Sequence, residues 1–334
     1  MRELVIIGAG VAGLAAGQEL EQLKPLVLEK SRGLGGRLHS RTLKSAIEGP
    51  NTITADIGAQ YFTARHDSFL TQVKQWQQQG VLTLWQGQIA SWHQAKISHS
   101  SPEKRWVGLP KMQQITKLMA KGLDVQLSSL VTSCLWLADQ ECWQIELNQG
   151  STLLTRRLLL ACPLDQAQAL LANNADEHSP PDWPAPMQPC LCFVIASKHP
   201  LTLDFDGLFV NDQPIAWMAR NNSKPGREPH ELWVIHLSSQ ASKQLINLNN
   251  PQRWQQLWLW LKQLELPIDW QDFQEIDCHL WRYARPADQR QQLFMEHQAS
   301  NLWLAGDWLA GGRVEGAWLS GKSSSQAILD HFNG

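Results

Sequence analysis

The sequence contains few charged residues and no run of basic ones. Charged side chains make up 18% of the 334 residues, the formal net charge is -2, and no segment concentrates lysine and arginine. Proteins that bind nucleic acids or anionic membrane surfaces present clusters of positive charge. We therefore expect neither a nucleic acid nor a membrane as a partner.

Long hydrophobic runs are also missing. No stretch reaches the roughly 20 apolar residues that a bilayer-spanning helix needs. The short apolar run at residues 3–7 continues directly into a glycine motif, without the basic region and cleavage site of a signal peptide. We therefore expect a cytoplasmic location.

The six cysteines are scattered, and no two of them have the C-x-x-C spacing of zinc and redox sites. Cys190 and Cys192 could in principle ligate a metal, but they lie in an apolar run where alternate residues of a strand share a face. We expect buried free thiols and no metal site.

Hydrophobic periodicity predicts alternating strands and helices at both ends of the chain. The predicted strands cover residues 3–7, 25–29, 123–127, 131–137, 142–147, 153–161, 190–196, 215–220, 231–237 and 302–305. The predicted helices cover residues 14–23, 68–79, 110–121, 252–264 and 316–332. The three strands between residues 131 and 161 are close enough in sequence to form a meander.

A glycine-rich motif lies between the first predicted strand and helix. Gly8, Gly10 and Gly13 form the pattern G-x-G-x-x-G, and Glu29 ends the next strand. The glycines allow a tight turn, close approach of the backbone to a diphosphate, and close packing of helix on strand. The helix N-terminus then faces the diphosphate, and Glu29 can accept hydrogen bonds from the adenosine ribose. This unit predicts a dinucleotide site.

A second glycine-rich loop follows at residues 33–36 and ends at Arg37. A flexible loop with a guanidinium suits the second side of an extended diphosphate, which an NAD site does not need. A solvated turn is the alternative explanation. Together, the two loops resemble the FAD fingerprint of the flavin amine oxidase and glutathione reductase-like superfamily.

A third element near the end of the chain is Gly306-Asp307, which follows the predicted strand 302–305. In the superfamily that the loops resemble, this aspartate lies against the ribityl chain of FAD, and the next helix points its N-terminus at the pyrimidine end of the flavin. A positive helix end stabilises the anionic reduced flavin. Alternatively, Asp307 only caps the helix.

Four more segments resemble the renalase family, including its bacterial members. They cover residues 56–65, 106–112, 279–286 and 311–321. With the terminal motifs, the resemblance covers most of the chain and is weak from about residue 165 to 275. It implies non-covalent FAD and oxidation of dihydropyridine isomers of NAD(P)H to NAD(P)+, with reoxidation of the flavin by O2 to H2O2.

The resemblance also implies an α/β fold of the p-hydroxybenzoate hydroxylase type, in which a discontinuous Rossmann-type FAD-binding domain carries an inserted α+β substrate domain. The chain is long enough for two domains, and the proline-rich segment 173–189 has the composition of a linker between them. We expect residues 1–64, 107–164 and 276–334 to form the FAD-binding domain, and residues 65–106 and 165–275 to form the substrate domain.

The motifs and the resemblance assign one set of residues to FAD. By analogy, the segment 58–60 lies near the isoalloxazine, Val131 contacts the adenine through its backbone, and residues 314–317 cap the flavin. The complete set is Gly8, Gly10, Ala12, Gly13, Glu29, Lys30, Gly36, Arg37, Ile57, Gly58, Ala59, Gln60, Val131, Gly306, Asp307, Val314 and Ala317.

The implied reaction requires no acid, base or nucleophile from the protein. Hydride passes from a substrate carbon to flavin N5, so that catalysis is mainly orientation and electrostatics. We expect the substrate pocket to include Gln60, Trp217, His236, Tyr283 and Arg313. Core packing for Trp217, in a chain with 17 tryptophans, and a structural role for His236 are the alternatives.

The last motif departs from amine oxidases, which place an aromatic residue just before Glu-Gly-Ala. Here Arg313-Val314 precedes Glu315-Gly-Ala, and an arginine suits a phosphate or carboxylate better than a protonated amine. No cysteine in the last 50 residues offers a tether for covalent flavin. An amine or polyamine oxidase and a non-catalytic, regulatory flavin-binding module are the alternatives.

Overall fold

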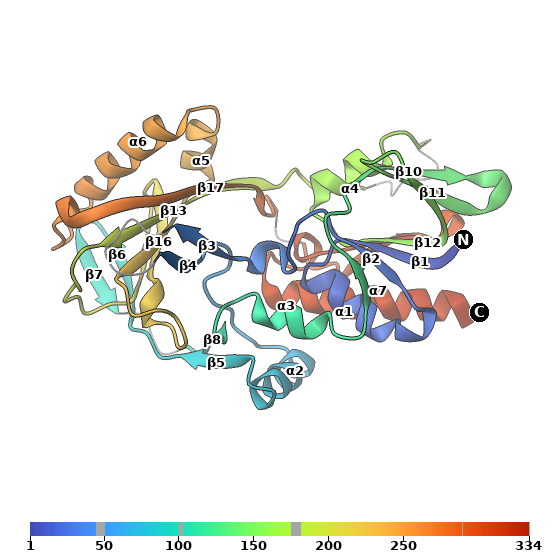
Figure 1. The fold of residues 1–334 in the computed structure, drawn as a ribbon, viewed down its shortest axis with the longest axis horizontal. Helices are drawn as coiled ribbons and strands as arrows, with labels where there is room; N and C mark the ends of the chain where they lie inside the picture. The colour runs from blue at the N-terminus through green and yellow to red at the C-terminus, as the bar shows by residue number, and fades with distance from the viewer. Residues whose placement is uncertain (45–50, 100–102, 175–181, 289, 334) are drawn as a thin grey trace.

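Two large sheets form the scaffold of the protein in the computed structural model, which describes residues 1–44, 51–99, 103–174, 182–288 and 290–333. Figure 1 shows them side by side along the long axis of the molecule. One has eight strands and the other has seven.

The eight-stranded sheet has a parallel centre. Its strand order is β10-β11-β12-β1-β2-β9, and β19 pairs with both β12 and β18. The pairs β1–β12, β1–β2, β2–β9 and β12–β19 are all parallel, whereas β10, β11 and β12 form an antiparallel meander. The strands are β1 (Arg2–Ile7), β2 (Leu26–Leu28), β9 (Asp124–Gln126), β10 (Val131–Leu137), β11 (Cys142–Leu147), β12 (Thr152–Leu160), β18 (Phe294–His297) and β19 (Leu302–Ala305).

Side chains of β1 alternate between two hydrophobic cores, because successive residues of a strand point to opposite faces. Leu4 and Ile6 belong to a core with α1 (Val11–Glu19), α3 (Gln114–Met119) and α7 (Val314–Asn333). Val5 and Ile7 face the other core, with α4 (Leu164–Leu171) and the meander. Figure 1 shows α1, α3 and α7 together on one side of this sheet. The arrangement confirms the expected Rossmann-type α/β fold.

Close packing of α1 on α7 joins the two ends of the chain. A side chain at Gly321 would lie 2.2 Å from the Ala12 carbonyl oxygen, so only glycine permits this approach. The helix that ends the chain is thereby fixed against the helix that follows the first glycine motif.

The seven-stranded sheet has the order β17-β13-β16-β15-β14-β6-β7. Helices α5 (Ser239–Leu245) and α6 (Asn250–Gln263) cover one face, and the hairpin β3 (Ser40–Lys44) and β4 (Thr52–Asp56) packs on the other (Figure 1). The strands are β6 (Ile89–His93), β7 (Lys96–His99), β13 (Gln188–Ser197), β14 (Gly207–Val210), β15 (Ile215–Arg220), β16 (Leu232–Leu237) and β17 (Phe273–Arg285). A smaller sheet pairs β5 (Leu82–Trp85) with β8 (Arg105–Gly108), and α2 (Asp67–Gln78) packs beside β5.

Two expectations about secondary structure need correction. The helix predicted over residues 110–121 begins only at Gln114, because Pro110 lies in a turn and the backbone N–H of Met112 donates to Asp56 instead of continuing a helix. Sequence periodicity also missed β17, which pairs with β13 over its whole length. The linker expected at residues 173–189 overlaps the start of β13 at residues 188 and 189, and its residues 175–181 lie outside the described part of the chain.

The boundary expected at residue 276 falls inside β17. We propose to keep the division into an FAD-binding domain and an inserted substrate domain, and to assign all of β17 to the substrate domain because its partner β13 belongs to the same sheet. Within the described residues, no helix is both long and apolar enough to cross a membrane.

Candidate functional site

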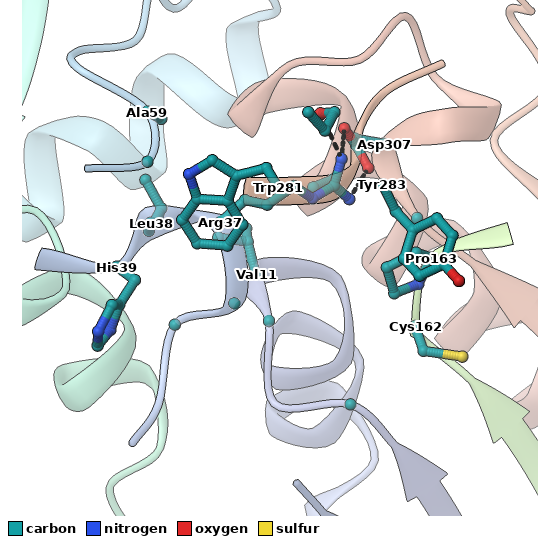
Figure 2. A pocket seen from close by; sticks show the side chains of 18 of the residues that line it. Val11, Arg37, Leu38, His39, Ala59, Cys162, Pro163, Trp281, Tyr283 and Asp307 are labelled. Carbon is teal, nitrogen blue, oxygen red and sulfur yellow. Dashed lines mark hydrogen bonds and ion pairs between the residues drawn. The ribbon is translucent and has the colours of Figure 1, made fainter. Parts of the chain in front are cut away.

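A cavity of about 1540 Å³ is lined by residues of both sheets and by the loops that follow β1, β2 and β19. Its walls come from the first 65 residues, from the middle of the chain and from the last 55 residues. Figure 2 shows part of it, with Arg37 reaching Asp307. A cavity of this volume is large enough for a dinucleotide and a second small molecule.

The first glycine loop leaves space where a diphosphate would lie. Gly8 has φ +109°, and a side chain there would lie 2.7 Å from the Ala161 carbonyl oxygen. A side chain at Gly13 would lie 2.0 Å from the Gly8 carbonyl oxygen. At Gly10, by contrast, a Cβ would have no neighbouring atom within 4 Å, and Gly10 lines the cavity at the N-terminus of α1. Backbone donors at a helix start bind anions.

Glu29 holds this loop in place. Its side chain is buried, and its two carboxylate oxygens accept the backbone N–H groups of Ala9 and Ser31, both at 2.9 Å. One acceptor therefore connects the first glycine loop to the segment after β2. Because each oxygen of a carboxylate can accept more than one hydrogen bond, Glu29 can still bind a ribose hydroxyl at the cavity.

The second glycine loop contacts the first. The Gly35 N–H donates to the Ala9 carbonyl oxygen at 3.2 Å. Gly36 has φ +50°, and a Cβ added there would lie 3.6 Å from Gly10 Cα. Both loops line the same end of the cavity. They therefore form one continuous backbone surface for a diphosphate.

Arg37 and Asp307, which are far apart in the sequence, form a two-point ion pair at the cavity wall. Arg37 Nη1 donates to Asp307 Oδ2 at 2.8 Å, Nη2 donates to Oδ1, and Nη1 also donates to the Ala284 carbonyl oxygen at 3.1 Å (Figure 2). Two residues that we expected to bind the cofactor are therefore in direct contact at the cavity wall. Asp307 is therefore more than a helix cap, since its carboxylate joins the end of the chain to its beginning.

The segment 57–60 is fixed from both sides. A side chain at Gly58 would lie 2.0 Å from the Arg37 carbonyl oxygen, and the Ala59 N–H donates to that same oxygen at 2.9 Å. The Ile57 carbonyl oxygen accepts His236 Nε2 at 3.1 Å and Trp281 Nε1 at 2.9 Å. Strands from the second sheet therefore position this segment against the glycine loops.

A buried cluster of charged side chains holds the segment 57–60 in place. The Asp56 carboxylate accepts Lys224 Nζ at 3.3 Å and Arg227 Nη2 at 2.6 Å, and the Lys224 and Asp56 side chains are 0% and 1% exposed. Lys224 Nζ also donates to Gln60 Oε1 at 2.8 Å, and Gln60 Nε2 donates to the carbonyl oxygens of Asp56 and Gly58. Gln60 lines the cavity, but its amide is engaged in holding the loop.

Burial has opposite consequences for the charges of this cluster. It is the largest influence on Asp56 and would raise its pKa, but the Lys224 and Arg227 charges and the hydrogen bond from Ser40 outweigh it, so the pKa is lowered. For Lys224 burial prevails and lowers the pKa to about 8. Arg227 is the closer partner of the shared carboxylate, so we infer that Asp56 stays ionised and that Lys224 loses its proton most readily.

The N-terminus of α7 closes another part of the wall. Val314 and Ala317 line the cavity, and Arg313 lies exposed at its edge. Glu315 accepts the backbone N–H groups of Arg65 and His66, both at 2.7 Å. Its carboxylate therefore fixes the start of α2 to the start of α7 and forms no bond with Arg313.

Part of the cavity wall is aromatic. Trp217 on β15 and His236 on β16 are direct cross-strand partners, and both line the cavity with Tyr61 and Phe209. Trp217 lies 5.7 Å from Tyr61 and 4.5 Å from Phe209 between ring centroids. The sequence pattern offered no signal for Tyr61 or Phe209 as wall residues, because aromatic residues are equally expected in a core.

The cavity brings together nearly all the residues expected from the sequence. All five candidates for the substrate pocket line it, and so does every residue expected at the cofactor except Gly13 and Ile57. Gly13 lies behind the loop against Gly8, and Ile57 is buried with only its carbonyl oxygen engaged by the second sheet. Lys224 and Arg227 were missed, because they lie in a region without any recognisable motif.

His236 is expected to make stability fall on mild acidification. Burial lowers its pKa from 6.5 to about 4, a difference that corresponds to about 3 kcal/mol. Below pH 6.5 His236 binds a proton in the unfolded chain but stays neutral in the folded protein. The free energy of unfolding therefore falls as the pH is lowered from 6.5 to 4.

Urea unfolding at several pH values checks this. We expect His236→Phe to reduce the change in the free energy of unfolding between pH 6.5 and pH 4. His93→Gln, at an exposed position, should leave that change as in the wild type. An unchanged dependence in His236→Phe would contradict the assignment.

Comparisons with known proteins identify the family of the chain and proteins of similar fold. The family model "Flavin containing amine oxidoreductase" matches residues 86–329, and the model "NAD(P)-binding Rossmann-like domain" matches residues 6–75. A candidate protoporphyrinogen oxidase from Exiguobacterium sp. 255-15 has a similar fold, with a TM-score of 0.75 at 12% identity over 100% of this chain and 99% of that one. Wild-type putrescine oxidase bound to putrescine has a TM-score of 0.65 at 14% identity over 98% and 99% of the two chains.

The cavity fits FAD on structural grounds. Space is open beside Gly10, two glycine loops face it, and the hydrogen-bond acceptor Glu29 and the donor Arg37 also line the cavity. The chain belongs to the flavin containing amine oxidoreductase family, and it is an FAD-dependent oxidoreductase.

Proposed function

We propose that the protein is a renalase-like oxidase that converts dihydropyridine isomers of NAD(P)H to NAD(P)+ and passes the electrons to O2, forming H2O2. The observation that carries the proposal is the charge of the substrate side of the cavity. Arg282 and Arg285 on β17 line it together with Arg313, and within the described residues none of the three has a carboxylate partner. This wall favours an anionic nucleotide and repels a protonated amine.

FAD supplies the hydride acceptor when it is bound. The protein's part is to bind and orient. The rings of Trp217 and Tyr61 give a planar ligand an aromatic surface to contact, and hydrogen bonds fix the neighbouring segment 58–60. His236 stays neutral at physiological pH, because burial lowers its pKa to about 4. No proton transfer to a protein side chain is needed.

We propose the remaining roles as the sequence suggested them. The glycine loops, Glu29 and Arg37 bind the diphosphate and ribose, Val131 contacts the adenine, and Val314 with Ala317 covers the flavin. The other residues that we propose to contact or position FAD are Ala12, Gly13, Lys30, Ile57, Gly58, Ala59, Gln60, Gly306 and Asp307. The flavin is non-covalent, and the oxidase works in the cytoplasm.

Amine oxidation is the second candidate. The aromatic wall would also suit the alkyl part of an amine, and a protein of similar fold is named putrescine oxidase. The unpaired arginines argue against it. A purely regulatory flavin module would need no open cavity beside the flavin, and the volume of about 1540 Å³ favours an enzyme.

Anaerobic mixing of the purified yellow protein with 2- and 6-dihydro-NAD(P) isomers tests the proposal. We expect at least one isomer to bleach the flavin rapidly, ordinary 4-dihydro-NAD(P)H to do so far more slowly, and air to restore the colour with formation of H2O2. Bleaching by putrescine or another polyamine, with no response to any dihydropyridine, would replace this proposal by amine oxidation.

A further inference from the structure

Trp217 lines the cavity and carries a buried hydrogen-bond donor without a partner among the described residues. Its side chain is 5% exposed, and among the described residues its indole N–H has no acceptor. Buried donors in folded proteins are almost always satisfied, so an unpaired one in a cavity wall points to a group on a ligand. The neighbouring rings of Tyr61 and Phe209 offer no acceptor to the N–H in this arrangement.

His236 presents an acceptor beside it. The Nε2 atom lies 3.1 Å from the Ile57 carbonyl oxygen, which can only accept, so Nε2 carries the hydrogen. In the neutral ring Nδ1 is then a free acceptor, and no hydrogen bond to it is formed within the described ranges of the chain. Trp217 and His236 are opposite each other on adjacent strands, so their side chains share one face of the sheet.

A donor next to an acceptor is the complement of a primary carboxamide, whose oxygen accepts and whose NH2 donates. We propose that Trp217 and His236 form a carboxamide subsite, in which Trp217 Nε1–H donates to the amide oxygen and His236 Nδ1 accepts from the amide nitrogen. This rests on the proposed function, because the ring that carries the carboxamide would be the dihydropyridine. The subsite lies next to the segment 58–60, since His236 is bonded to Ile57.

The subsite also separates substrate classes. An alkyl amine carries donors and no acceptor, so it would leave the Trp217 N–H unpaired, at the cost of burying a polar group. A carboxylate carries acceptors and no donor, so it would leave His236 Nδ1 unpaired. Only a group with both functions satisfies the pair.

The test uses the oxidised holoenzyme and three ligands that differ at one substituent: nicotinamide, 3-acetylpyridine and 3-methylpyridine. Binding is followed by the change in the visible absorbance of the flavin, without turnover. We expect nicotinamide to bind about fivefold to tenfold more tightly than 3-methylpyridine, the range of one or two neutral hydrogen bonds, with 3-acetylpyridine between them.

Two variants assign the bonds. Trp217→Phe keeps an aromatic ring without the N–H, and we expect it to remove the preference for 3-acetylpyridine over 3-methylpyridine, while nicotinamide keeps the advantage of its bond to His236. His236→Phe leaves the Ile57 carbonyl oxygen with its bond from Trp281, and we expect it to remove the preference for nicotinamide over 3-acetylpyridine only. The matched control is Trp258→Phe, on α6 and away from the cavity, which should behave like the wild type.

The wild-type series decides the matter even if a variant fails to fold. Equal binding of nicotinamide and 3-methylpyridine, no binding of nicotinamide, or a preference for 3-acetylpyridine over 3-methylpyridine that survives in Trp217→Phe would each overturn the subsite. If the dihydropyridines reduce the flavin but the preference is absent, the subsite is wrong and the proposed function stands. If the preference is present but no dihydropyridine reduces the flavin, the subsite stands for another carboxamide ligand.

Discussion

Gly10→Val is expected to give a folded protein that retains no FAD. No atom lies within 4 Å of the position that a Cβ would take, and the backbone at φ -80° and ψ -177° is extended, which valine adopts without strain. The new side chain would project into the cavity and separate the diphosphate from the backbone donors at the start of α1. Losing two charge-assisted bonds weakens binding by roughly 100-fold or more.

The flavin-to-protein ratio of the purified variant, and titration of the apoprotein with FAD, measure this effect. Gly13→Ala is the informative contrast, because its Cβ would lie 2.0 Å from the Gly8 carbonyl oxygen. We expect Gly13→Ala to destabilise the fold, whereas Gly10→Val should fold but lack the yellow colour of bound FAD. A stable, yellow Gly10→Val protein would place the diphosphate elsewhere and contradict the site.

Asp56→Ala is expected to lower the free energy of unfolding by about 3–5 kcal/mol, the usual result of removing one partner from a buried ion pair. It leaves the Lys224 and Arg227 side chains, 0% and 2% exposed, without their carboxylate. The Ser40 hydroxyl and the Met112 N–H lose their acceptor as well. This is a large fraction of the stability of a typical domain.

Urea unfolding checks the size of the effect. Adding Lys224→Met to Asp56→Ala should restore part of the lost stability, because it removes one of the two uncompensated cations. Asp124→Ala breaks an exposed pair with Arg2 and should cost less than about 1 kcal/mol. Equal effects of Asp56→Ala and Asp124→Ala, or no gain from the second substitution, would show that the buried cluster contributes little.

Local patterns were enough to predict the cofactor end of the molecule. The glycine spacing, Glu29 and the final strand and helix each express a rule that operates within about 30 residues: a turn, a helix start, an alternation of apolar side chains. The parallel centre of the first sheet and the meander followed from the same periodicity. The family models that match residues 6–75 and 86–329 agree with this part of the prediction.

The region from 165 to 285 was harder to interpret. Strands β13 and β16 are apolar over most of their length, so periodicity gave their position but not their neighbours. Strand β17 was missed because its residues show no clear alternation. Gln60 is an example at the site. Its position in the sequence suggested a substrate contact, whereas its amide is used by Lys224 and two backbone carbonyls. A polar residue near a motif does not reveal which way its side chain points.

By itself, the sequence determined that the chain builds a dinucleotide site at its start and completes it at its end, because glycine spacing and strand pattern are local properties. Tertiary structure alone decided which side chains meet there. Three groups of side chains bring together segments that are distant in sequence. They are the Arg37–Asp307 ion pair, the charged cluster around Asp56, and the cross-strand neighbours Trp217 and His236. Such contacts depend on how two sheets pack, and packing is set by the whole chain at once.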